Sequence, residues 1–432
     1  MTSGQAVRPP QAVAPAPAPS PWLVKRLFPI LATVSLIVIG MIGTTIVGPH
    51  LIGRVRWSLP DDLWGTLIAA DRLVHLNLAG LYTQPTGLVT FPGAAVILAP
   101  VATLIDAAGL SLQHPGPHNP QPAVWLVAGP YVIAISGVAL FAADALAERL
   151  RVPRWKRFFL AGASAVALWN VSVQWGHPED AVAVGLLLFG FLALSEARTA
   201  RSAWLLGAAI AVQPLVLLAV PILLAGIEPR RIPGFLARAA APAAVLLGAA
   251  AAANWHATYL AVAHQPNWPT VDHPTPWTPL APHMAAGAVA DGPFRLLAIL
   301  AACGCALFVA RRLRVGRHAP GRNGEWSEET LRELLWWAAL ALGLRCVFEP
   351  VMVAYYLWPA LAVALIAATR TWPRLLATSV IATAVTFGSQ STWRSPWGWW
   401  GSMVAGLALT LVFSAPTSRH VFNYVRTVLA RN

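Results

Sequence analysis

Carboxylate and imidazole side chains gather in three short polar segments of this chain, each placed between apolar stretches. A carboxylate within hydrogen-bond reach of a hydroxyl group can take its proton, and an imidazole titrates near neutral pH, so these residues could perform acid–base chemistry. The three segments contain the adjacent acids Asp61 and Asp62, the run His177-Pro178-Glu179-Asp180, and a longer stretch with His256, His264, Asp272, His273 and His283.

The first polar segment begins a stretch with helical periodicity. After Asp61 and Asp62, apolar residues recur at steps of three or four from Leu63 to Leu81, which is the spacing of one helical face. We therefore predict a helix that lies in the membrane interface. Its polar face would carry Thr66, Asp71, Arg72, His75 and Asn77. Acids also stabilise the exposed amides of a first helical turn, so capping is an alternative role for Asp61, although two adjacent acids are harder to explain by capping alone.

The second polar segment has two interpretations. Pro178 followed by Glu179 and Asp180 suits the start of a helix, because proline fits the first helical position and acids fit the first turn. In the functional interpretation, these acids bind an acceptor or supply a second carboxylate facing Asp62, and His177 contributes to the same site.

The third polar segment, residues 254–292, interleaves its histidines with Trp255, Trp268 and Trp277. Sugar and lipid head-group sites favour aromatic walls with a few polar groups, and Asp272-His273 could orient a phosphate or act as an acid–base pair. The alternative is a belt of interfacial tryptophans with solvated histidines. No spacing in this segment matches a zinc motif, and we predict no metal and no cofactor.

The surroundings of these segments are strongly apolar. The chain of 432 residues is 57% hydrophobic and only 11% charged, whereas ordinary soluble domains carry about a quarter charged residues. A formal charge of +13 would suggest a nucleic-acid partner in a soluble protein. Here the basic residues lie in loops between long apolar runs, which indicates the positive-inside bias of a membrane protein with lipid, not nucleic acid, around it.

Apolar runs of about 20 residues are long enough to span a bilayer as helices. The first such run extends from Phe28 to about Gly48, and further candidate spans lie near 123–147, 158–175, 181–197, 235–253, 293–310, 331–347, 355–369, 375–393 and 398–415. We predict an all-α polytopic integral membrane protein with about 10–12 transmembrane helices, and with interfacial and re-entrant helices on its outer face.

The basic loops predict the orientation of the spans. Cytoplasmic loops are rich in Lys and Arg, and this rule places all basic residues inside except Arg54, Arg56, Arg72, Arg295, Arg345 and Arg394. The three polar segments then fall on the outer face, in the outer loops 49–88, 176–180 and 254–292 or beside them. The predicted parts of the chain are a disordered cytoplasmic tail (1–24), a membrane domain (25–415) and a cytoplasmic C-terminal tail (416–432).

Two apolar stretches, 89–110 and 203–226, would break the charge rule if each crossed the membrane once. The loops on either side of each stretch are predicted to share a side, so each stretch should enter the membrane and return. Proline breaks a helix, and a broken helix at membrane depth must line protein or a water-filled cavity, commonly near a substrate site. We predict breaks at Gln213-Pro214 in one stretch and at Pro92 and Pro100 in the other. The alternative is a tilted, proline-kinked helix.

The first polar segment and its neighbours resemble a known family. An outer loop that directly follows the first span and carries an acid is similar to that of the GT-C superfamily of membrane glycosyltransferases. The order of Asp62, an amphipathic helix, Gly80-Leu81-Tyr82 and then Phe91-Pro92 resembles the polyprenyl-phosphate-mannose-dependent mannosyltransferases of actinobacteria, which include the phosphatidylinositol mannoside enzymes. The likeness covers about residues 25–230. Thr90-Phe91-Pro92-Gly93 stands in place of the family's Tyr-Pro-Pro, and Gln213 in place of its Lys.

The resemblance implies transfer of a sugar, mannose or arabinose, with inversion. The donor would be a polyprenyl-phosphate sugar and the acceptor a cell-envelope glycolipid or lipoglycan, on the outer face of the plasma membrane. Such a transfer needs a base for the acceptor hydroxyl. By its spacing to Tyr82 we expect Asp62 to be that base, with Asp61 as the second choice. A carboxylate near the sugar ring would also stabilise an oxocarbenium-like transition state.

The donor phosphate needs a cation, and a guanidinium group matches its geometry. Arg345 lies at membrane depth, where a charge is costly and commonly functional, although an ion pair with Glu349 four residues later is the alternative. The predicted phosphate-binding residues are Arg345, His273 and Arg394. The predicted acceptor- and sugar-binding residues are His177, Glu179, Asp180, Tyr82, Gln213 and Asp272.

Two other function classes remain open. A transporter or flippase of lipid-linked sugars would be favoured by polar residues at several depths, and the predicted spans are nearly free of charge in mid-membrane. A non-catalytic membrane scaffold in envelope biosynthesis is the other class. The cytoplasmic loops contain no Gly-rich phosphate loop, which disfavours ATP-driven transport by this chain alone.

Overall fold

A computed structural model describes residues 22–46, 58–84, 86, 88, 90–116, 119–290, 293–315, 325–391 and 397–416. Within these residues nearly all regular structure is helical, and the two short strands, β1 (His273–Pro274) and β2 (Val351–Met352), pair antiparallel. The prediction of a mainly helical protein with several helices long and apolar enough to span a membrane is confirmed at this level. Outside the described residues lie most of both predicted tails (1–21 and 417–432) and Arg54, Arg56 and Arg394.

Five helical stretches in the described part of the chain are long and apolar enough to cross a membrane, judged by length and composition. They are formed by α2 (Leu27–Ile46), α6 (Pro122–Ser136) continuing into α7 (Val138–Arg149), α9 (Pro178–Ser195), η4 (Pro229–Arg231) continuing into α12 (Ile232–Ala253), and α14 (Phe294–Val315). Shorter apolar helices are α5 (Gly93–Ala107), α10 (Thr199–Val212), η3 (Pro214–Ala219) with α11 (Val220–Ala225), η7 (Ala354–Leu357) with α16 (Trp358–Ala367) and η8 (Ala368–Arg370), and α18 (Gly398–Ser414).

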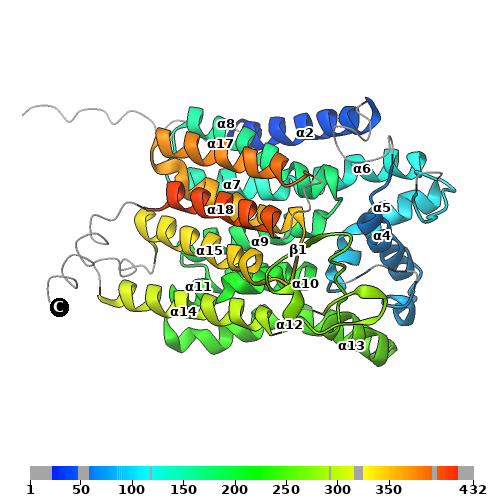
Figure 1. The fold of residues 1–432 in the computed structure, drawn as a ribbon. Coiled ribbons are helices and arrows are strands. Elements are labelled where there is room, and N and C mark those ends of the chain that lie inside the picture. The colour runs from blue at the N-terminus through cyan, green and yellow to red at the C-terminus, as the bar shows by residue number, and fades with distance from the viewer. Residues whose placement is uncertain are drawn as a thin grey trace, which may run out of the picture.

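The remaining helices complete the bundle. They are α1 (Trp22–Lys25), α4 (Asp61–Val74), η1 (Leu78–Gly80), α8 (Arg154–Trp169) with the π-helical turn η2 (Asn170–Gln174), α13 (Trp255–Ala263), η5 (Thr278–Leu280), η6 (Ala285–Gly287), α15 (Glu328–Phe348) and α17 (Trp372–Gly388). Figure 1 shows the long helices side by side, with α4 and α13 grouped at one end. The centre is formed by α9, whose span is 83% buried, and by α16, in which every residue is buried.

The predicted cytoplasmic loops meet at one end of the bundle, here called the basic end. Arg149 at the end of α7 donates hydrogen bonds to the carbonyl oxygens of Ser195 and Trp326, at 3.3 and 2.9 Å. Arg332 on α15 donates to the carbonyl oxygen of Leu150 at 3.0 Å. These contacts join the loops that precede α8, follow α9 and precede α15. Loops that the charge pattern assigned to one side therefore share one end.

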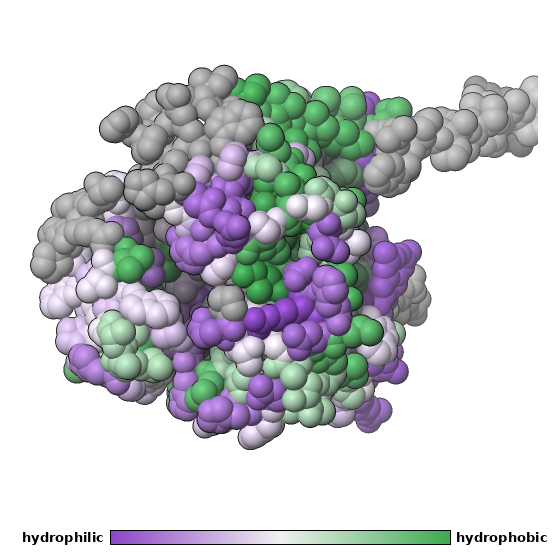
Figure 2. All heavy atoms as spheres, turned by 90° about the vertical axis from the view of Figure 1, so that its right-hand side faces the viewer, coloured by the Kyte–Doolittle hydropathy of each residue, from purple (hydrophilic) through white to green (hydrophobic). Residues whose placement is uncertain are grey.

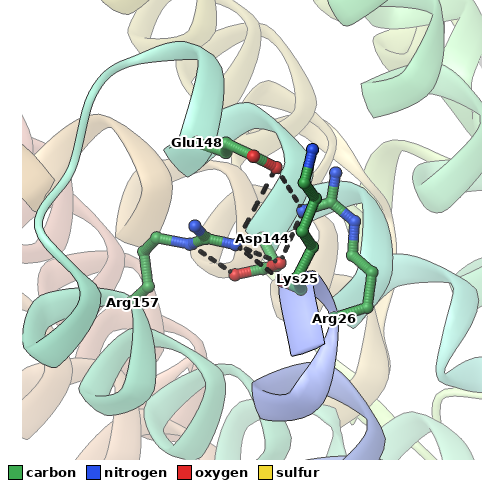
Figure 3. Close-up of polar contacts among 5 residues, drawn as sticks. All are labelled: Lys25, Arg26, Asp144, Glu148 and Arg157. Carbon is green, nitrogen blue, oxygen red and sulfur yellow. Dashed lines mark hydrogen bonds and ion pairs between the residues drawn. The ribbon is translucent and has the colours of Figure 1, made fainter. Parts of the chain in front are cut away.

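A buried ion-pair cluster joins the first helices at the basic end (Figure 3). Asp144 on α7 is 2% exposed, and its two carboxylate oxygens accept hydrogen bonds from Arg157 of α8 at 2.8 and 2.7 Å. Arg26, between α1 and α2, donates to Asp144 at 2.9 Å and pairs with Glu148 at 2.6 Å. A buried carboxylate that loses such partners is strongly destabilising. The cluster thus fixes α7, α8 and the start of α2 against one another.

The stretch 203–226 is broken and returns to the end from which it starts, as predicted. The helix α10 stops one residue before Gln213, which is extended (φ −151°, ψ 114°) and is followed by η3. Pro214 has no N–H with which to continue the hydrogen bonds of α10. After α11, Gly226 lies directly against Trp326, which belongs to the basic end. The alternative of a single tilted helix is wrong for this stretch.

The stretch 89–110 is broken at only one of its two predicted positions. The helix α5 begins at Gly93, directly after Pro92, and continues without interruption through Pro100. The predicted break at Pro100 is therefore wrong. Pro100 has no N–H to donate to the carbonyl oxygen of Val96, so one helical hydrogen bond is missing. Both residues lie on the exposed side of α5, outside the packed core, and the helix continues past them.

The predicted interfacial helix is shorter than its apolar periodicity indicates. The helix α4 stops two residues before Leu76, whose left-handed backbone (φ 55°) ends the helical path. Arg72 donates to the carbonyl oxygens of Gly80 and Thr83, the latter at 2.8 Å, and so holds a compact turn where further helical turns were expected. Thr66, expected on the polar face, is buried, and its hydroxyl is satisfied by donating to a backbone carbonyl one turn earlier, at 3.1 Å.

The third polar segment, 254–292, is more regular than the predicted loop. Asn254 accepts a hydrogen bond from the amide of Ala257 at 3.1 Å and so caps α13, a helix that was not predicted. Farther along, β1 pairs with β2, and Thr275 donates to the carbonyl oxygen of Glu349 at 2.8 Å. These contacts hold the segment over the end of the bundle opposite the basic end, here called the cavity end (Figure 1).

Candidate functional site

A cavity of about 870 Å³ lies at the cavity end, bordered by residues of α4, α13 and η7. Figure 2 looks onto this end and shows hydrophilic residues gathered across it. The polar wall residues include Asp61, Asp62, Tyr82, Gln84, Gln174, His256, His264, Gln265, Asn267 and Asp272, and the aromatic ones include Trp175, Trp268, Tyr355 and Tyr356. The described residues of the wall include no Lys and no Arg.

Asp62 stands in the first turn of α4, at the wall of the cavity. Pro60 precedes the helix in an extended conformation, and the helix begins at Asp61. The side chain of Asp62 is 47% exposed, and its Oδ2 lies 3.0 Å from Nε2 of His177. His177 thus contacts one carboxylate oxygen of Asp62, while the Asp62 side chain borders the cavity.

Gly176 allows the second polar segment to approach α4. Its backbone is left-handed (φ 67°), a conformation that glycine adopts without strain. A Cβ at this position would come within 2.9 Å of both Leu63 and Pro60. A glycine between η2 and α9 therefore makes possible the close contact that brings His177 beside Asp62.

His177 bridges two carboxylates. Its Nε2 faces Asp62, and its Nδ1 lies 2.6 Å from Oε1 of Glu179. The ring packs against Tyr355 with centroids 4.0 Å apart, and the backbone N–H donates to the carbonyl oxygen of Val171 at 2.7 Å. Burial disfavours the charged ring, but the carboxylates of Glu179 and Asp62 outweigh this effect and raise the pKa of His177 well above its usual value. The protonated ring donates to both acids.

Asp180 belongs to a second polar network, which depends on the break in the stretch 203–226. Gln213 donates to Oδ1 of Asp180 at 2.7 Å, and its own Oε1 accepts from Thr90 at 2.9 Å. The hydroxyl of Tyr82 donates to the carbonyl oxygen of Thr90 at 2.9 Å. Burial raises the pKa of Tyr82, so its hydroxyl stays neutral and remains a donor. The extended backbone at Gln213 thereby links Asp180 to a residue of the cavity wall.

Glu179 and Asp180 lie behind the cavity wall. The predicted helix start is present, since α9 begins at Pro178, and the two acids in its first turn are 3% and 1% exposed. Each acid keeps one buried carboxylate oxygen, Oε2 and Oδ2, without a hydrogen-bond partner among the described residues. The predicted contact of these acids with a sugar or acceptor stays a prediction. Hydrogen bonds connect Glu179 to the cavity through His177 and Asp62.

Arg345 also lies behind the wall. Its guanidinium group stacks on the ring of Tyr356 at 3.6 Å, and its Nε lies 3.6 Å from Oε1 of Glu349. Arg295 pairs with the same oxygen at 2.5 Å. Burial alone would raise the pKa of Glu349, but the guanidinium groups of Arg295 and Arg345 outweigh burial and lower it. The ion pair that was the alternative role for Arg345 is present, and Tyr356 stands between Arg345 and the cavity.

The other predicted phosphate-binding residues are not on the described wall. His273 in β1 stacks its ring on that of Trp399 in α18, with centroids 3.7 Å apart and planes 5° from parallel. Arg394 lies outside the described residues. The neighbour of His273, Asp272, does line the cavity.

Several wall residues were not among the predicted site residues. His256 and His264 lie on α13 and at its end, and this helix was not predicted. Tyr355 both lines the cavity and covers the ring of His177. The signal that could have marked Tyr355 is its position in an aromatic pair just after Glu349-Pro350, at the predicted outer end of a span, because aromatic walls are typical of ligand sites.

The arrangement presents a half-exposed carboxylate, held from behind by His177, to a cavity with aromatic walls. Such a carboxylate can take a proton from a hydroxyl group of a bound ligand. Among the described residues, no group of three or more His, Cys, Asp or Glu side chains is placed to hold a metal ion. Comparison of the chain with protein-family models and with curated proteins gave no match.

Proposed function

We propose that this chain is a membrane glycosyltransferase of the GT-C type, which transfers mannose or arabinose from a polyprenyl-phosphate donor to a glycolipid or lipoglycan of the cell envelope. The observation that carries the proposal is the position of Asp62, a 47% exposed carboxylate on the wall of a cavity of about 870 Å³. This volume lies in the ordinary range of ligand sites, about 300–1,000 Å³, and aromatic walls with a few polar groups suit a sugar.

In the proposed reaction Asp62 is the base. Its Oδ1 takes the proton of the acceptor hydroxyl, and the hydroxyl oxygen forms a bond to the anomeric carbon of the donor sugar. On the opposite face, the bond between that carbon and the phosphate oxygen breaks, and polyprenyl phosphate leaves. Inversion follows from this single displacement, and nearby carboxylates stabilise the oxocarbenium-like transition state.

The donor phosphate would meet imidazole groups on the wall of the cavity. His256 and His264 are the described wall residues that become cations on protonation, and a protonated imidazole donates charge-assisted hydrogen bonds to a phosphate. Arg345 would reach the cavity after a movement of Tyr356, so its predicted phosphate contact remains part of the proposal.

The membrane arrangement proposed with this function has about 10–12 spans. The five long apolar stretches would be joined by the shorter helices, with α4 and α13 in the interface. The basic end would face the cytoplasm, and the cavity end the outside of the plasma membrane. A donor with a polyprenyl tail could then enter from the outer leaflet, and the 69% exposed Trp255 on α13 is suited to the lipid–water boundary.

Substitution of Asp62 by Asn tests this function. The wild-type protein in lipid nanodiscs should transfer labelled sugar from polyprenyl-phosphate mannose or polyprenyl-phosphate arabinose to an envelope glycolipid extract. The Asp62→Asn variant should be at least about 100-fold slower, because the loss of a general base costs about 10²–10⁴-fold. Asp71→Asn is the matched control, since Asp71 lies on the same helix beside His75, at 3.5 Å, and should keep its activity. Full transfer by the Asp62→Asn protein would contradict the proposal.

A transporter or flippase of lipid-linked sugars is the alternative. The broken helix at Gln213 beside the buried Asp180 favours it, because broken helices border substrate sites in many transporters. Movement of a labelled polyprenyl-phosphate sugar between the leaflets of vesicles, with no transfer and no effect of Asp62→Asn, would support this alternative instead.

A further inference from the structure

We propose that His177 and Glu179 are positioning residues for the base. His177 holds Oδ2 of Asp62 and leaves Oδ1 to receive the proton of the acceptor hydroxyl, and Glu179 holds His177. This inference rests on the proposed function, because it takes Asp62 as the base. The three residues come from the first turn of α4, the residue before α9 and the first turn of α9, so only the folded chain brings them together.

The ring of His177 has little freedom to move. One face packs against Tyr355 at 4.0 Å, and the backbone N–H donates to the carbonyl oxygen of Val171 at 2.7 Å. The residue before it is Gly176, which lies in close contact with α4. A ring that is held on its face, at its backbone and at both nitrogens cannot rotate without breaking several contacts. It therefore fixes the orientation of the carboxylate that it binds.

Glu179 determines which form of His177 is present. Its carboxylate is 3% exposed, and its Oε1 lies 2.6 Å from Nδ1, a short distance of the kind found in charge-assisted hydrogen bonds. An ionised carboxylate can only accept, and Asp62 on the other side of the ring is also an acceptor. Both ring nitrogens must therefore carry hydrogen, and the imidazolium form satisfies both acids.

Other titratable groups also face the ring. Asp180 on α9 interacts with the charge of His177 and with that of Arg345 on α15. Tyr355 on η7 presents the face of its ring, 31° from parallel with the imidazole. In its ionised form Asp180 attracts the protonated ring through this charge interaction. Its contact with Gln213 keeps this acid in place.

The proton balance of the proposed step leaves His177 unchanged. The acceptor O–H bond breaks, and its proton goes to Oδ1 of Asp62. The hydrogen on Nε2 of His177 stays on that nitrogen and donates to Oδ2 before and after the step. His177 thus acts through Asp62 and does not touch the substrate.

Two substitutions at position 177 separate the hydrogen bond from the charge. Glutamine keeps an N–H donor close to the position of Nε2 but does not titrate, and alanine removes the donor. His177→Ala should lower kcat by about 10- to 100-fold while the acceptor KM stays within about twofold, because contacts to the acceptor are unchanged. His177→Gln should recover most of this loss. His75→Gln, at the exposed end of α4, is the matched control and should behave as wild type.

The pH dependence of the transfer rate distinguishes a positioning role of His177 from a purely structural one, because a structural role would leave it unchanged. The wild-type rate should fall at alkaline pH as His177 loses its proton, and His177→Gln should lack this limb of the profile. In Glu179→Gln the limb should move to lower pH, because the carboxylate that favours the imidazolium is gone. Gel filtration and thermal unfolding show whether each variant is folded.

The outcomes distinguish this inference from the proposed function. If Asp62→Asn retains transfer, the function fails and the inference fails with it. If Asp62→Asn is inactive but a folded His177→Ala protein matches wild type in rate and pH profile, only the inference is overturned. It is also overturned by a folded His177→Gln protein that is inactive or that keeps the alkaline limb.

Discussion

At the scale of residues, the site depends on a contact between Asp62 and His177, which are 115 positions apart in the chain. Each lies in a polar segment whose sequence also suits a helix start, and the structure combines the two roles. The helix α4 begins at Asp61 and α9 begins at Pro178, and the same first turns supply Asp62 and Glu179. Acids that are favoured by the exposed amides of a first turn are thereby placed where they can also perform chemistry.

The raised pKa of His177 predicts a stability that depends on pH. The folded protein binds this proton more tightly than the unfolded chain, whose imidazole has a pKa of 6.5. The contribution of His177 is therefore fully present below pH 6.5 and is lost as the pH rises through the higher folded pKa. Thermal unfolding in detergent between about pH 6 and pH 10 should show this loss for wild type and much less of it for His177→Gln. An identical pH dependence of the two proteins would contradict the assignment.

The titratable residues of the site could be predicted from the sequence, but most of their contacts could not. The residue types and polar surroundings of Asp62, His177 and Glu179 were sufficient to mark them. Which acids face the cavity depends on the rotations of α4 and α9, and packing against distant helices sets these rotations. The pair of Arg345 with Glu349 follows from a spacing of four residues, whereas the ring of Tyr356 over Arg345 is a tertiary contact that spacing does not predict.

At the scale of elements, the junction between η2 and α9 is tightly constrained at Gly176. An alanine there would need a left-handed backbone, and its Cβ would overlap Leu63 and Pro60. We expect Gly176→Ala to lower the free energy of unfolding by about 2 kcal/mol, and to slow transfer because His177 shifts away from Asp62.

Gly162→Ala in α8 is the matched control for this prediction. Apart from the backbone of its own helix turn, no described atom lies within 4 Å of a Cβ at Gly162, and alanine favours a helix, so this variant should be at least as stable as wild type. Denaturant-induced unfolding in detergent compares the two proteins. Equal stability of Gly176→Ala and Gly162→Ala would contradict the close contact between the two segments.

The positions of helices were predictable where a single physical rule dominates. Apolar length predicts the long apolar helices, and the charge rule together with Pro214 predicts the break at Gln213. Three predictions about helices were wrong, each for a local or tertiary reason. The predicted break at Pro100 is absent because this proline lies on an exposed helix flank. The helix α13 was missed because its nine residues are too few for a clear periodicity among prolines and tryptophans, and the end of α4 was misplaced because it depends on the contacts of Arg72 with a later turn.

At the scale of the whole molecule, the basic loops and the polar segments lie at opposite ends, and this separation predicts a labelling pattern. Leu280 in η5 is 64% exposed at the cavity end, and Arg230 in η4 is exposed at the basic end. A membrane-impermeant maleimide should label Leu280→Cys in intact cells, and Arg230→Cys only after permeabilisation. Both variants are made in a background without Cys303, Cys305 and Cys346. The reverse pattern would place the cavity on the cytoplasmic side and contradict the proposed orientation.

The separation of the two ends was predictable from the sequence because it follows from charge alone. The cavity was not, because its wall combines residues from the first polar segment, α13 and η7, and no local pattern relates these parts of the chain. Composition could therefore predict the membrane class and the polar end. The volume enclosed there and the side chains that line it required the packed structure.

The most direct test of the central claim is the glycolipid profile of cells that lack this protein and are complemented with wild type or with Asp62→Asn. We predict that a mannose- or arabinose-containing envelope glycolipid disappears on deletion and that its unglycosylated precursor accumulates. Wild type should restore the missing species, and Asp62→Asn at the same expression level should not. An unchanged profile on deletion, or full restoration by Asp62→Asn, would contradict the proposed activity.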